Sequence, residues 1–463
     1  MESTQNLAQS DNQNQEEQYD HVILSWQPYN GMRHAHLTRK EIYDQRDQKS
    51  QIAIVPALML FMPMTHDVLL PNYPIPNLLD GIIMKPDHSS FKILKVGGNT
   101  ESGTKSVNIG FVNCSFNYKD MSLCDYCPRN LVKRAILALQ QKHNISVKIG
   151  YEIEFNVLDM DGKPINKHSG LNLDALLKQS DVLIRISNEL NSQGVRVLNM
   201  HKESSHGQYE IVLDYDDVLK SIDNYNFAIQ VIKQNFQREG KQISLLPRPF
   251  ENQFCNGLHI HMSIWRDGKN ILGDSAGQHL LTVEGQQFMA GILEHSSAIN
   301  HFLAPSPNSM KRIQSHMCAG TFKIWGLENR DAILRLIQTD SVEGRPTHFE
   351  LKALDHTANQ CFALASVLVA ATNGLDKEMK LPQPVNDVPL FIPEDAWQEK
   401  GITILPQTYE DRKVAVYSEE NKVLLEFFGK PLIDNIFLIS DEDFKELDGK
   451  SISEQFELLN SKF

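Results

Sequence analysis

The chain has 463 residues, 41% hydrophobic and 22% charged, an ordinary globular composition with room for one large or two moderate domains. Its 58 acidic and 45 basic residues give a formal net charge of −13, which argues against nucleic acid and anionic membranes as partners. No secretory signal is visible, no apolar run reaches about 18 residues, and the six cysteines are too sparse for a disulfide scaffold. We therefore expect a cytoplasmic protein with reduced thiols and no membrane span.

The first part of the chain is predicted to form a small domain. Residues 1–18 are polar and of low complexity, so we expect them to be disordered. From residue 19 to 124, short apolar runs are broken by Pro, Gly and Asn, which predicts a strand-rich domain. The apolar run from Ile52 to Met64 is interpreted as a buried strand or loop. Residues 125–463 would form the second domain, which begins just before a helix.

Beyond this boundary the apolar spacing alternates between helical and strand periods, which indicates an α+β arrangement. The segment Asn130–Lys142 is predicted as a helix because Leu131, Ala135, Ile136 and Leu139 share one face. Further helices are predicted at 172–190, 216–239, 283–301 and 358–373. Strands are predicted at 147–158, 195–199, 208–214, 241–247, 257–265, 321–326, 332–337 and 348–354.

Acid and histidine side chains gather on these strands. Side chains two apart on a strand point to the same face, so Glu152 and Glu154 form one pair and His259 and His261 another. Three further acids stand in the other segments: Glu203, Glu210 and Glu350. Taken alone, either pair could be a solvated strand face or two core histidines with satisfied hydrogen bonds. Together, five carboxylates and an imidazole match the needs of two hard divalent cations, and a packed core would not tolerate five unpaired carboxylates. The set predicts a two-metal phosphoryl-transfer site.

Arginines are a second chemical signal. Arg330 and Arg335 carry guanidinium groups, which clamp phosphate oxygens and stabilise the charge that develops during phosphoryl transfer. Surface ion pairing is the alternative reading of these two residues. Arg312 could hold a substrate carboxylate.

Two other motifs are not interpreted as functional sites. Gly98 to Ser106 looks like a phosphate-binding loop, but one residue intrudes between the second glycine and Lys105, and no strand-then-helix context surrounds it. Cys124 and Cys127 have the spacing of half a zinc or redox site, but no second pair accompanies them. We expect these cysteines to be structural.

Taken in order, the motifs resemble those of the glutamine synthetase family over roughly residues 85–375. The matching segments are Gly150–Phe155, Glu203 with Gly207–Glu210, Asn256–His261, Trp325–Arg335 and Glu350–Asn359. Pro86–Phe91 and Cys127–Arg129 are similar to the segments that join the two domains of that family.

The resemblance implies a role for each matching residue. Glu154, Glu203 and Glu210 would hold one Mg²⁺ or Mn²⁺ ion, and Glu152, His259 and Glu350 the other. The residues that would meet ATP are His261, Ser263, Arg330 and Arg335. Those that would meet glutamate are Asn256, Gly257, Arg312 and Lys352. The implied catalytic residues are Arg330, Arg312 and Glu350.

A fold, an assembly and a reaction are also implied. The fold would be a small N-terminal β-grasp domain beside a larger catalytic α+β domain, with a curved antiparallel sheet flanked by helices. The assembly would be a homo-oligomeric double ring, a decamer or dodecamer, with active sites between neighbouring subunits. In the reaction, ATP would convert the γ-carboxylate of glutamate to an acyl phosphate, which an amine would then attack.

The amine side of the site departs from the family pattern. Cys318 stands where the family often has an acid that binds ammonium and takes its proton. Lys352 and His348 stand where arginines are expected, and Asp67 is a weak match for the ammonium-loop acid of the first domain. The residues for metal and ATP are retained, whereas those for the amine are altered. This combination predicts a γ-glutamylamide ligase for a bulkier amine, such as a monoamine or polyamine. The alternatives are an ammonia-using glutamine synthetase and a non-catalytic structural or regulatory assembly.

Overall fold

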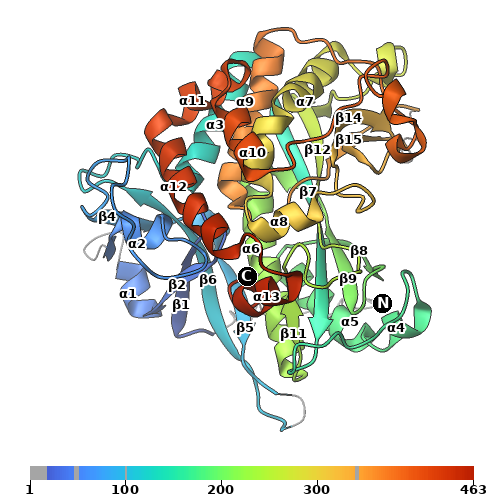
Figure 1. Ribbon diagram of the computed structural model, residues 1–463. Helices are drawn as coiled ribbons and strands as arrows, with labels where there is room; N and C mark the ends of the chain where they lie inside the picture. The colour runs from blue at the N-terminus through green and yellow to red at the C-terminus, as the bar shows by residue number, and fades with distance from the viewer. Residues whose placement is uncertain (1–17, 46–51, 100–101, 339–343) are drawn as a thin grey trace, which may run out of the picture.

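Two β-sheets of unequal size organise the chain in the computed structural model, which describes residues 18–45, 52–99, 102–338 and 344–463 (Figure 1). The segment predicted to be disordered lies outside these residues except for its last position. The smaller sheet is built from the N-terminal part of the chain, and the larger sheet and most helices follow. The predicted α+β fold class is confirmed, with a small β-rich part preceding a larger one.

The smaller sheet has the strand order β2-β1-β6-β4-β3, with β5 also paired to β6. Its strands are β1 His21–Trp26, β2 His34–Arg39, β3 Ile52–Ile54, β4 Ile82–Pro86, β5 Lys92–Val96 and β6 Val107–Asn117. Helix α1 spans Lys40–Gln45 and α2 spans Pro56–Leu60. The prediction of a strand or loop from residue 52 to 64 is therefore wrong in part. Pro56 starts a helix there, because its fixed φ suits the first helical position.

The larger sheet has the order β14-β15-β16-β12-β7-β9-β8. Its strands are β7 Ser146–Leu158, β8 Val197–Lys202, β9 Gln208–Leu213, β12 Leu258–Arg266, β14 Phe322–Leu327, β15 Ala332–Ile337 and β16 His348–Leu351. Short strands β10 Asp216–Asp217 and β11 Gln242–Ser244 join β7, and β13 Lys269–Asn270 joins β12. The pairing is antiparallel except between β14 and β15, which are parallel. All the predicted strands of this part form, although β11 and β16 are shorter than expected.

Helices cover the larger sheet and the junction with the smaller one (Figure 1). They are α3 Pro128–His143, α4 Leu173–Leu177, α5 Ser180–Ser192, α6 Val218–Arg238, α7 Val283–Leu303, α8 Pro307–Arg312, α9 Gln360–Asp376, α10 Tyr409–Tyr417, α11 Lys422–Phe428, α12 Lys430–Leu447 and α13 Ile452–Leu459. The single helix predicted at 172–190 is two helices. Gln179 leaves the helical conformation, and the hydroxyl of Ser180 donates to the Leu177 carbonyl at 2.8 Å.

Helices α7 and α9 form the centre of the helical layer. Every residue of α9 from 360 to 375 is buried. A side chain at Gly291 of α7 would lie 2.7 Å from the backbone nitrogen of Gly374 in α9, so the two glycines permit a close crossing. Among the described residues, no helix has both the length and the hydrophobicity needed to cross a membrane.

A buried ion pair cluster joins the two parts of the chain. Arg129 at the start of α3 donates to Asp223 of α6 at 2.6 Å and to Asp87, just after β4, at 3.0 Å. Burial opposes ionisation of Asp87, but Ser89, Lys133 and Arg129 together hold its pKa well below the usual range. Because the arginine is 4% exposed, losing it would leave two carboxylates without their partner.

Candidate active site

The functional candidates converge on a cavity of about 400 Å³ over the middle of the larger sheet. Most of the residues singled out from the sequence line this cavity: Glu152, Glu154, Glu203, Glu210, Gly257, His259, Arg312, Arg330, Arg335, Glu350 and Lys352. They come from strands β7, β9, β12, β15 and β16, from helix α8, and from the loops beside β8, β12, β14 and β16. Three candidates, Asn256, His261 and Ser263, are not among the residues that line it.

Strand register explains how the acids come together. Glu152 lies opposite His259 on the β12 side of β7, while Glu154 lies opposite Glu210 on the β9 side. Across β12 and β16, His261 is paired with Glu350. Because side chains alternate along each strand, these residues share the face of the sheet that borders the cavity.

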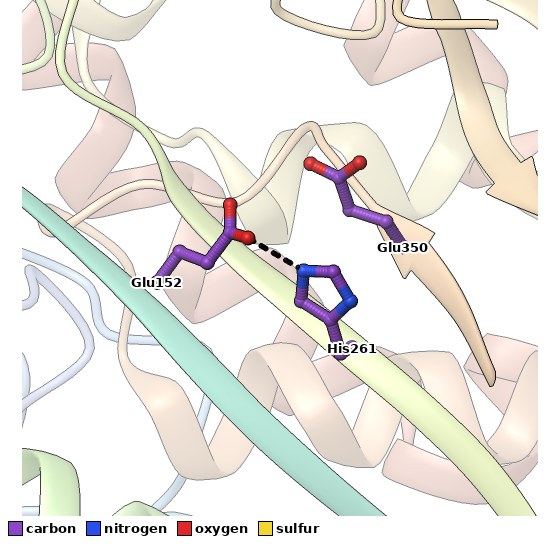
Figure 2. Close-up of side chains that lie close together, drawn as sticks. All are labelled: Glu152, His261 and Glu350. Atoms are coloured by element: carbon purple, nitrogen blue, oxygen red, sulfur yellow. Dashed lines mark hydrogen bonds and ion pairs between the residues drawn. The ribbon is translucent and has the colours of Figure 1, made fainter. Parts of the chain in front are cut away.

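One group of possible metal ligands consists of Glu152, His261 and Glu350, which point toward one another in Figure 2. One ligand atom from each lies within 4.8 Å of the others. His261 Nε2 is 2.8 Å from Glu152, and His259 Nδ1 is 3.1 Å from both Glu152 and Glu350. Both histidines therefore contact Glu152, and His259 also contacts Glu350, whereas the family resemblance implied His259 alone.

A second group consists of His201, Glu203 and Glu210. His201 Nε2 lies 2.9 Å from Glu203 and 3.8 Å from Glu210. Sequence reasoning missed His201, although it stands two residues before Glu203, the spacing that was used to pair the other ligands. Carboxylate and imidazole donors suit divalent cations, so the residues present fit a metal in both groups.

Glu154 lies between the two groups and is held by the protein on one side. Its Oε2 atom accepts hydrogen bonds from the Gly257 backbone at 2.7 Å and from Gln208 at 3.1 Å. The other oxygen, Oε1, lies 3.7 Å from His259 Nδ1. One oxygen of Glu154 is thus fixed in place, and the other faces the histidine.

The cluster carries more negative charge than the protein neutralises. Burial and the neighbouring carboxylates, Glu152 first, raise the pKa of Glu210 to about 10. Burial also opposes ionisation of Glu350, but Lys352, whose Nζ is 2.7 Å away, and His259 hold its pKa at about 2. One end of the cluster therefore has a lysine as its counter-charge, and the other end has only His201, whose pKa is raised by its hydrogen bond to Glu203.

Two arginines of the candidate set contact protein groups. Arg335 donates to Glu350 at 3.1 Å and to Glu328 at 2.5 Å. Arg312 is 1% exposed and donates to the carbonyls of Ala353 at 2.9 Å and Lys352 at 2.7 Å. Both side chains border the cavity, but Arg312 also fixes the turn that follows β16.

Arg330 is placed differently from the other two arginines. It is exposed and borders the cavity from the loop between β14 and β15. Its side chain is therefore open to solvent at the border of the cavity.

Asn256 is fully buried behind the cavity wall. Its amide donates to Asn156 at 2.7 Å and to the Leu246 carbonyl at 2.9 Å, and its oxygen accepts from Gln208 at 3.0 Å. The asparagine thus has protein partners for both ends of its side chain. Its neighbour Gly257 borders the cavity instead, and a side chain there would meet His259 at 2.4 Å.

A second cavity, of about 570 Å³, adjoins the first at Glu152. His261 and Ser263 of β12 line it, together with Tyr215 and Trp265. Two aromatic rings and a hydroxyl beside an acid cluster provide stacking and hydrogen-bonding groups of the kind that bind a nucleotide base. The residues predicted to meet ATP are therefore divided between two adjoining cavities.

Loops form the other side of the first cavity. Cys318 lines it with an exposed thiol, and positive φ angles occur at His316, Cys318 and Gly320. Asp331 is 9% exposed, and burial together with this carboxylate raises the pKa of the Cys318 thiol. Asp67, the weak match for an ammonium-loop acid, is not among the residues that line the cavity.

The cysteine pair and the glycine-containing segment, which were not interpreted as functional sites, have contacts typical of structural residues. Cys124 and Cys127 are buried free thiols, and Cys127 accepts a hydrogen bond from the Phe116 backbone at 3.3 Å. The described part of the Gly98–Ser106 segment lies between β5 and β6, where Asn99 bridges Thr104, and is not a strand-to-helix loop.

Comparison with protein families gives a match to the catalytic domain of glutamine synthetase over residues 125–458. The type-1 glutamine synthetase 1 of Dictyostelium discoideum is 29% identical over 328 residues, which are 67% of this chain and 64% of that protein. The gamma-glutamylpolyamine synthetase GlnA3 of Streptomyces coelicolor is 30% identical over 319 residues, 68% of each chain. The first of these alignments spans less than two thirds of the relative.

Solved structures share the fold at lower identity. A crystal structure of a novel glutamine synthase homologue has a TM-score of 0.82 at 19% identity, covering 96% of this chain and 98% of that one. A complex of GmaS with ADP has a TM-score of 0.77 at 20% identity, covering 94% and 95%. The predicted fold, a small β domain followed by a larger catalytic domain, is confirmed by these likenesses.

Proposed function

Because this chain belongs to the glutamine synthetase family of ATP-dependent carbon–nitrogen ligases, we propose that it joins glutamate to an amine as a γ-glutamylamide. The reaction would proceed through an acyl phosphate formed from ATP and the γ-carboxylate. The proposed acceptor is a primary amine larger than ammonia.

The observation that carries the proposal is the concentration of acids in one cavity. Five carboxylates border a volume of about 400 Å³, and the structure gives only part of this charge a cationic partner. A structural assembly would gain nothing from such a cluster, because uncompensated buried charge costs stability. Divalent cations would compensate the charge, and ATP chemistry requires them.

Two ligand groups are proposed for the cations. His201, Glu203 and Glu210 would hold one Mg²⁺ or Mn²⁺ ion with the free oxygen of Glu154, and Glu152, Glu350 and a histidine would hold the other. Bound there, the ions would supply positive charge to the phosphate oxygens and lower the barrier to phosphoryl transfer.

The protein's own residues would orient the substrates. The nucleotide base would lie in the second cavity, beside Ser263 and Trp265, and the phosphates would extend past Glu152 into the first. Glutamate would lie against Gly257 and the wall that Arg312 braces. Arg330, at the loop side, would contact the transferring phosphoryl group.

Two observations support an amine larger than ammonia. Cys318 provides an uncharged, exposed side chain at the position where the family often carries an acid. The relative from Streptomyces coelicolor is named a gamma-glutamylpolyamine synthetase. An acid is still available nearby, since Asp331 lies close enough to affect the thiol, and it could accept the proton that the attacking amine loses.

Ammonia is the alternative acceptor, since the Dictyostelium discoideum relative is named a glutamine synthetase. The test is phosphate release from ATP with Mg²⁺ and glutamate, across ammonium, monoamines and polyamines, with products identified by mass. We expect release that depends on one amine and yields its γ-glutamylamide. Ammonium as the best acceptor would contradict the amine assignment, and no release despite tight binding of ATP and metal would contradict glutamate or the acceptor class.

The same proposal covers assembly and location. A homo-oligomeric double ring in the cytoplasm is proposed from the family resemblance. Sedimentation of the purified chain would test the ring, with a monomer as the contradicting result.

A further inference from the structure

Strand β7 separates from β12 beside Glu154, within the acid cluster. The two strands are paired up to Ile153 opposite Leu258, and continuing the register would place Gly257 opposite Glu154. Leu258 donates to the Leu354 carbonyl at 3.0 Å, on the side away from β7, and the register with β7 ends there. This divergence opens the space that the acids border.

The divergence changes the partners of Glu154. Val157 donates to Gly207 on the β9 side, and hydrogen bonds of an antiparallel strand alternate sides, so the Glu154 carbonyl faces the β12 side. The Gly257 nitrogen, which a regular ladder would aim at this carbonyl, donates to the Glu154 carboxylate instead. A side chain from another segment supplies the missing donor, since His356 Nε2 lies 2.8 Å from the Glu154 carbonyl.

The directions of the hydrogen bonds through His356 follow from this contact. A carbonyl can only accept, so Nε2 carries the proton and Nδ1 of the neutral ring accepts. The partner of Nδ1 is the Tyr225 hydroxyl, 2.8 Å away, which must donate. That hydroxyl in turn accepts from Arg33 Nη2 at 2.7 Å. His356 and Tyr225 are both fully buried, so no water competes for these groups.

The series of hydrogen bonds that ends at Glu154 begins in the N-terminal part of the protein. Arg33 lies directly before β2, in a connection that packs on the segment after β16. Gly31 approaches the Thr357 carbonyl so closely that a side chain there would lie 1.7 Å from it. Gln27 donates to the Ala358 carbonyl at 3.0 Å. Arg33, the donor at the start of this series of hydrogen bonds, is thereby fixed against the same segment that carries His356.

We infer that Tyr225 and His356 are positioning residues that hold the backbone of Glu154 where its free carboxylate oxygen can reach a bound cation. Arg33 would orient Tyr225 from the N-terminal part of the chain. Outer partners of metal ligands commonly set metal affinity in this way. The inference rests on the proposed function, because it assigns Glu154 to a metal.

The test compares two buried tyrosines that have the same number of hydroxyl bonds. Tyr225→Phe removes the hydroxyl that links Arg33 to His356 but keeps the ring that stacks on Tyr151. Tyr209→Phe is the matched control, because its fully buried hydroxyl donates to Ala175 and accepts from Asn166 without contacting Glu154. Mn²⁺ affinity of the full chain is measured by titration calorimetry, with the melting temperature recorded for each variant.

We expect Tyr225→Phe to weaken Mn²⁺ binding about tenfold, against a change under about twofold for Tyr209→Phe. Both variants should lose similar thermal stability, because each leaves two partners without a hydroxyl. Equal Mn²⁺ affinities in the two variants would overturn the inference.

A second pair of variants addresses His356 directly. His356→Gln can still donate an amide hydrogen to the Glu154 carbonyl, whereas His356→Met has similar size and no donor. Affinity for Mn²⁺ should fall about tenfold or more in the methionine variant and recover to within about threefold in the glutamine variant. Equal losses in both would show a purely structural role.

Different experimental results would contradict the positioning role and the proposed function. Normal Mn²⁺ binding with the expected variant pattern, but no γ-glutamylamide, would contradict only the proposed reaction. Amide formation with identical effects of Tyr225→Phe and Tyr209→Phe would contradict only the positioning role. Absence of saturable Mn²⁺ binding in the unaltered chain would overturn the inference and the metal assignment together.

Discussion

The two sides of the acid-lined cavity are built differently. On one side, strands β7, β9 and β16 and the residue after β8 carry the carboxylates, and β12 carries the histidines. Strands β7, β9, β12 and β16 are each paired with neighbours on both sides. On the other side, the loop at 313–320 and the turn at Arg330 carry Cys318 and Asp331, with several positive φ angles. The strand side keeps all six metal ligands that the family resemblance implied and departs only at His348 and Lys352, whereas the loop side has Cys318 in place of the expected acid.

This difference separates two functions within one site. Strands hold several charges at fixed spacing, which metal and phosphate chemistry requires. Loops tolerate substitution at lower cost, so changes there can alter the acceptor without disturbing the metal ligands. We therefore expect strand-side variants to lose the reaction and loop-side variants to change its preference.

The largest effect is expected for Glu152→Ala on the strand side. This residue contacts both histidines and borders both cavities, so its loss should lower the rate by about 1000-fold or more. The stabilisation of the chain by Mg²⁺ with ATP, read as a thermal shift, should disappear. Glu284→Ala, which removes a half-exposed acid of α7, is the control and should keep both properties. An unchanged shift in Glu152→Ala would contradict its assignment as a ligand.

The second-largest effect is expected for Glu210→Gln, which should raise the free energy of unfolding of the metal-free protein. Glu210 keeps its proton in the folded chain up to about pH 10 but releases it near 4.5 when unfolded, so the metal-free protein loses stability as pH rises between these values. Glu210→Gln removes this loss. Its free energy of unfolding at pH 7 should exceed that of the unaltered chain by up to about 3 kcal/mol.

Denaturant unfolding in a chelating buffer from pH 5 to 9 measures this difference. The gap between the two proteins should widen as the pH rises, and saturating Mn²⁺ should reverse it. A Glu210→Gln variant that is less stable than the unaltered chain at every pH would show that the acid cluster is not strained.

On the loop side, Asp331→Asn should raise the KM for the amine about tenfold and leave the KM for ATP unchanged. The reason is that the carboxylate lies beside Cys318 and would contact the ammonium form of the acceptor. Steady-state kinetics with each substrate varied in turn distinguishes these effects. Equal increases for ATP and amine would place Asp331 outside the acceptor site.

The smallest effect concerns Cys318. Replacing it by Asp restores a carboxylate at this position, and should shift the ratio of kcat/KM for ammonium over the best amine about fivefold toward ammonium. Cys318→Ser is the matched control, since it is nearly the same size and uncharged. A shift of the same size in the serine variant would indicate that the thiol, and not the missing acid, governs acceptor choice.

The strand side of the cavity was predictable from the sequence because the alternation of side chains along a strand is visible in neighbouring residues. A two-residue period identifies the face that carries Glu152 and Glu154, and the long apolar patterns fix β7, β12 and the major helices. His201 had the same signal two residues before Glu203, and it was missed because no motif included it. Its ligand geometry depends on pairing with β9, which is a tertiary contact.

Other features depended on packing that a sequence period does not encode. Asn256 carries the right chemistry for a substrate, but buried partners on both sides occupy its amide. The break between α4 and α5 arises from one backbone conformation at Gln179, within an otherwise helical pattern. The link from Arg33 to Glu154 joins residues that are far apart in the chain, so only the fold brings them together.

The central claim, that an acyl phosphate of glutamate forms in this cavity, is tested by oxygen transfer. Glutamate labelled with ¹⁸O in its γ-carboxylate is incubated with ATP, Mg²⁺ and the best amine, and the released phosphate is analysed by mass spectrometry. Attack of the carboxylate on ATP, followed by the amine, leaves one labelled oxygen in each phosphate, and this is the result we predict. Unlabelled phosphate would show that water attacked ATP, and would contradict the proposed reaction.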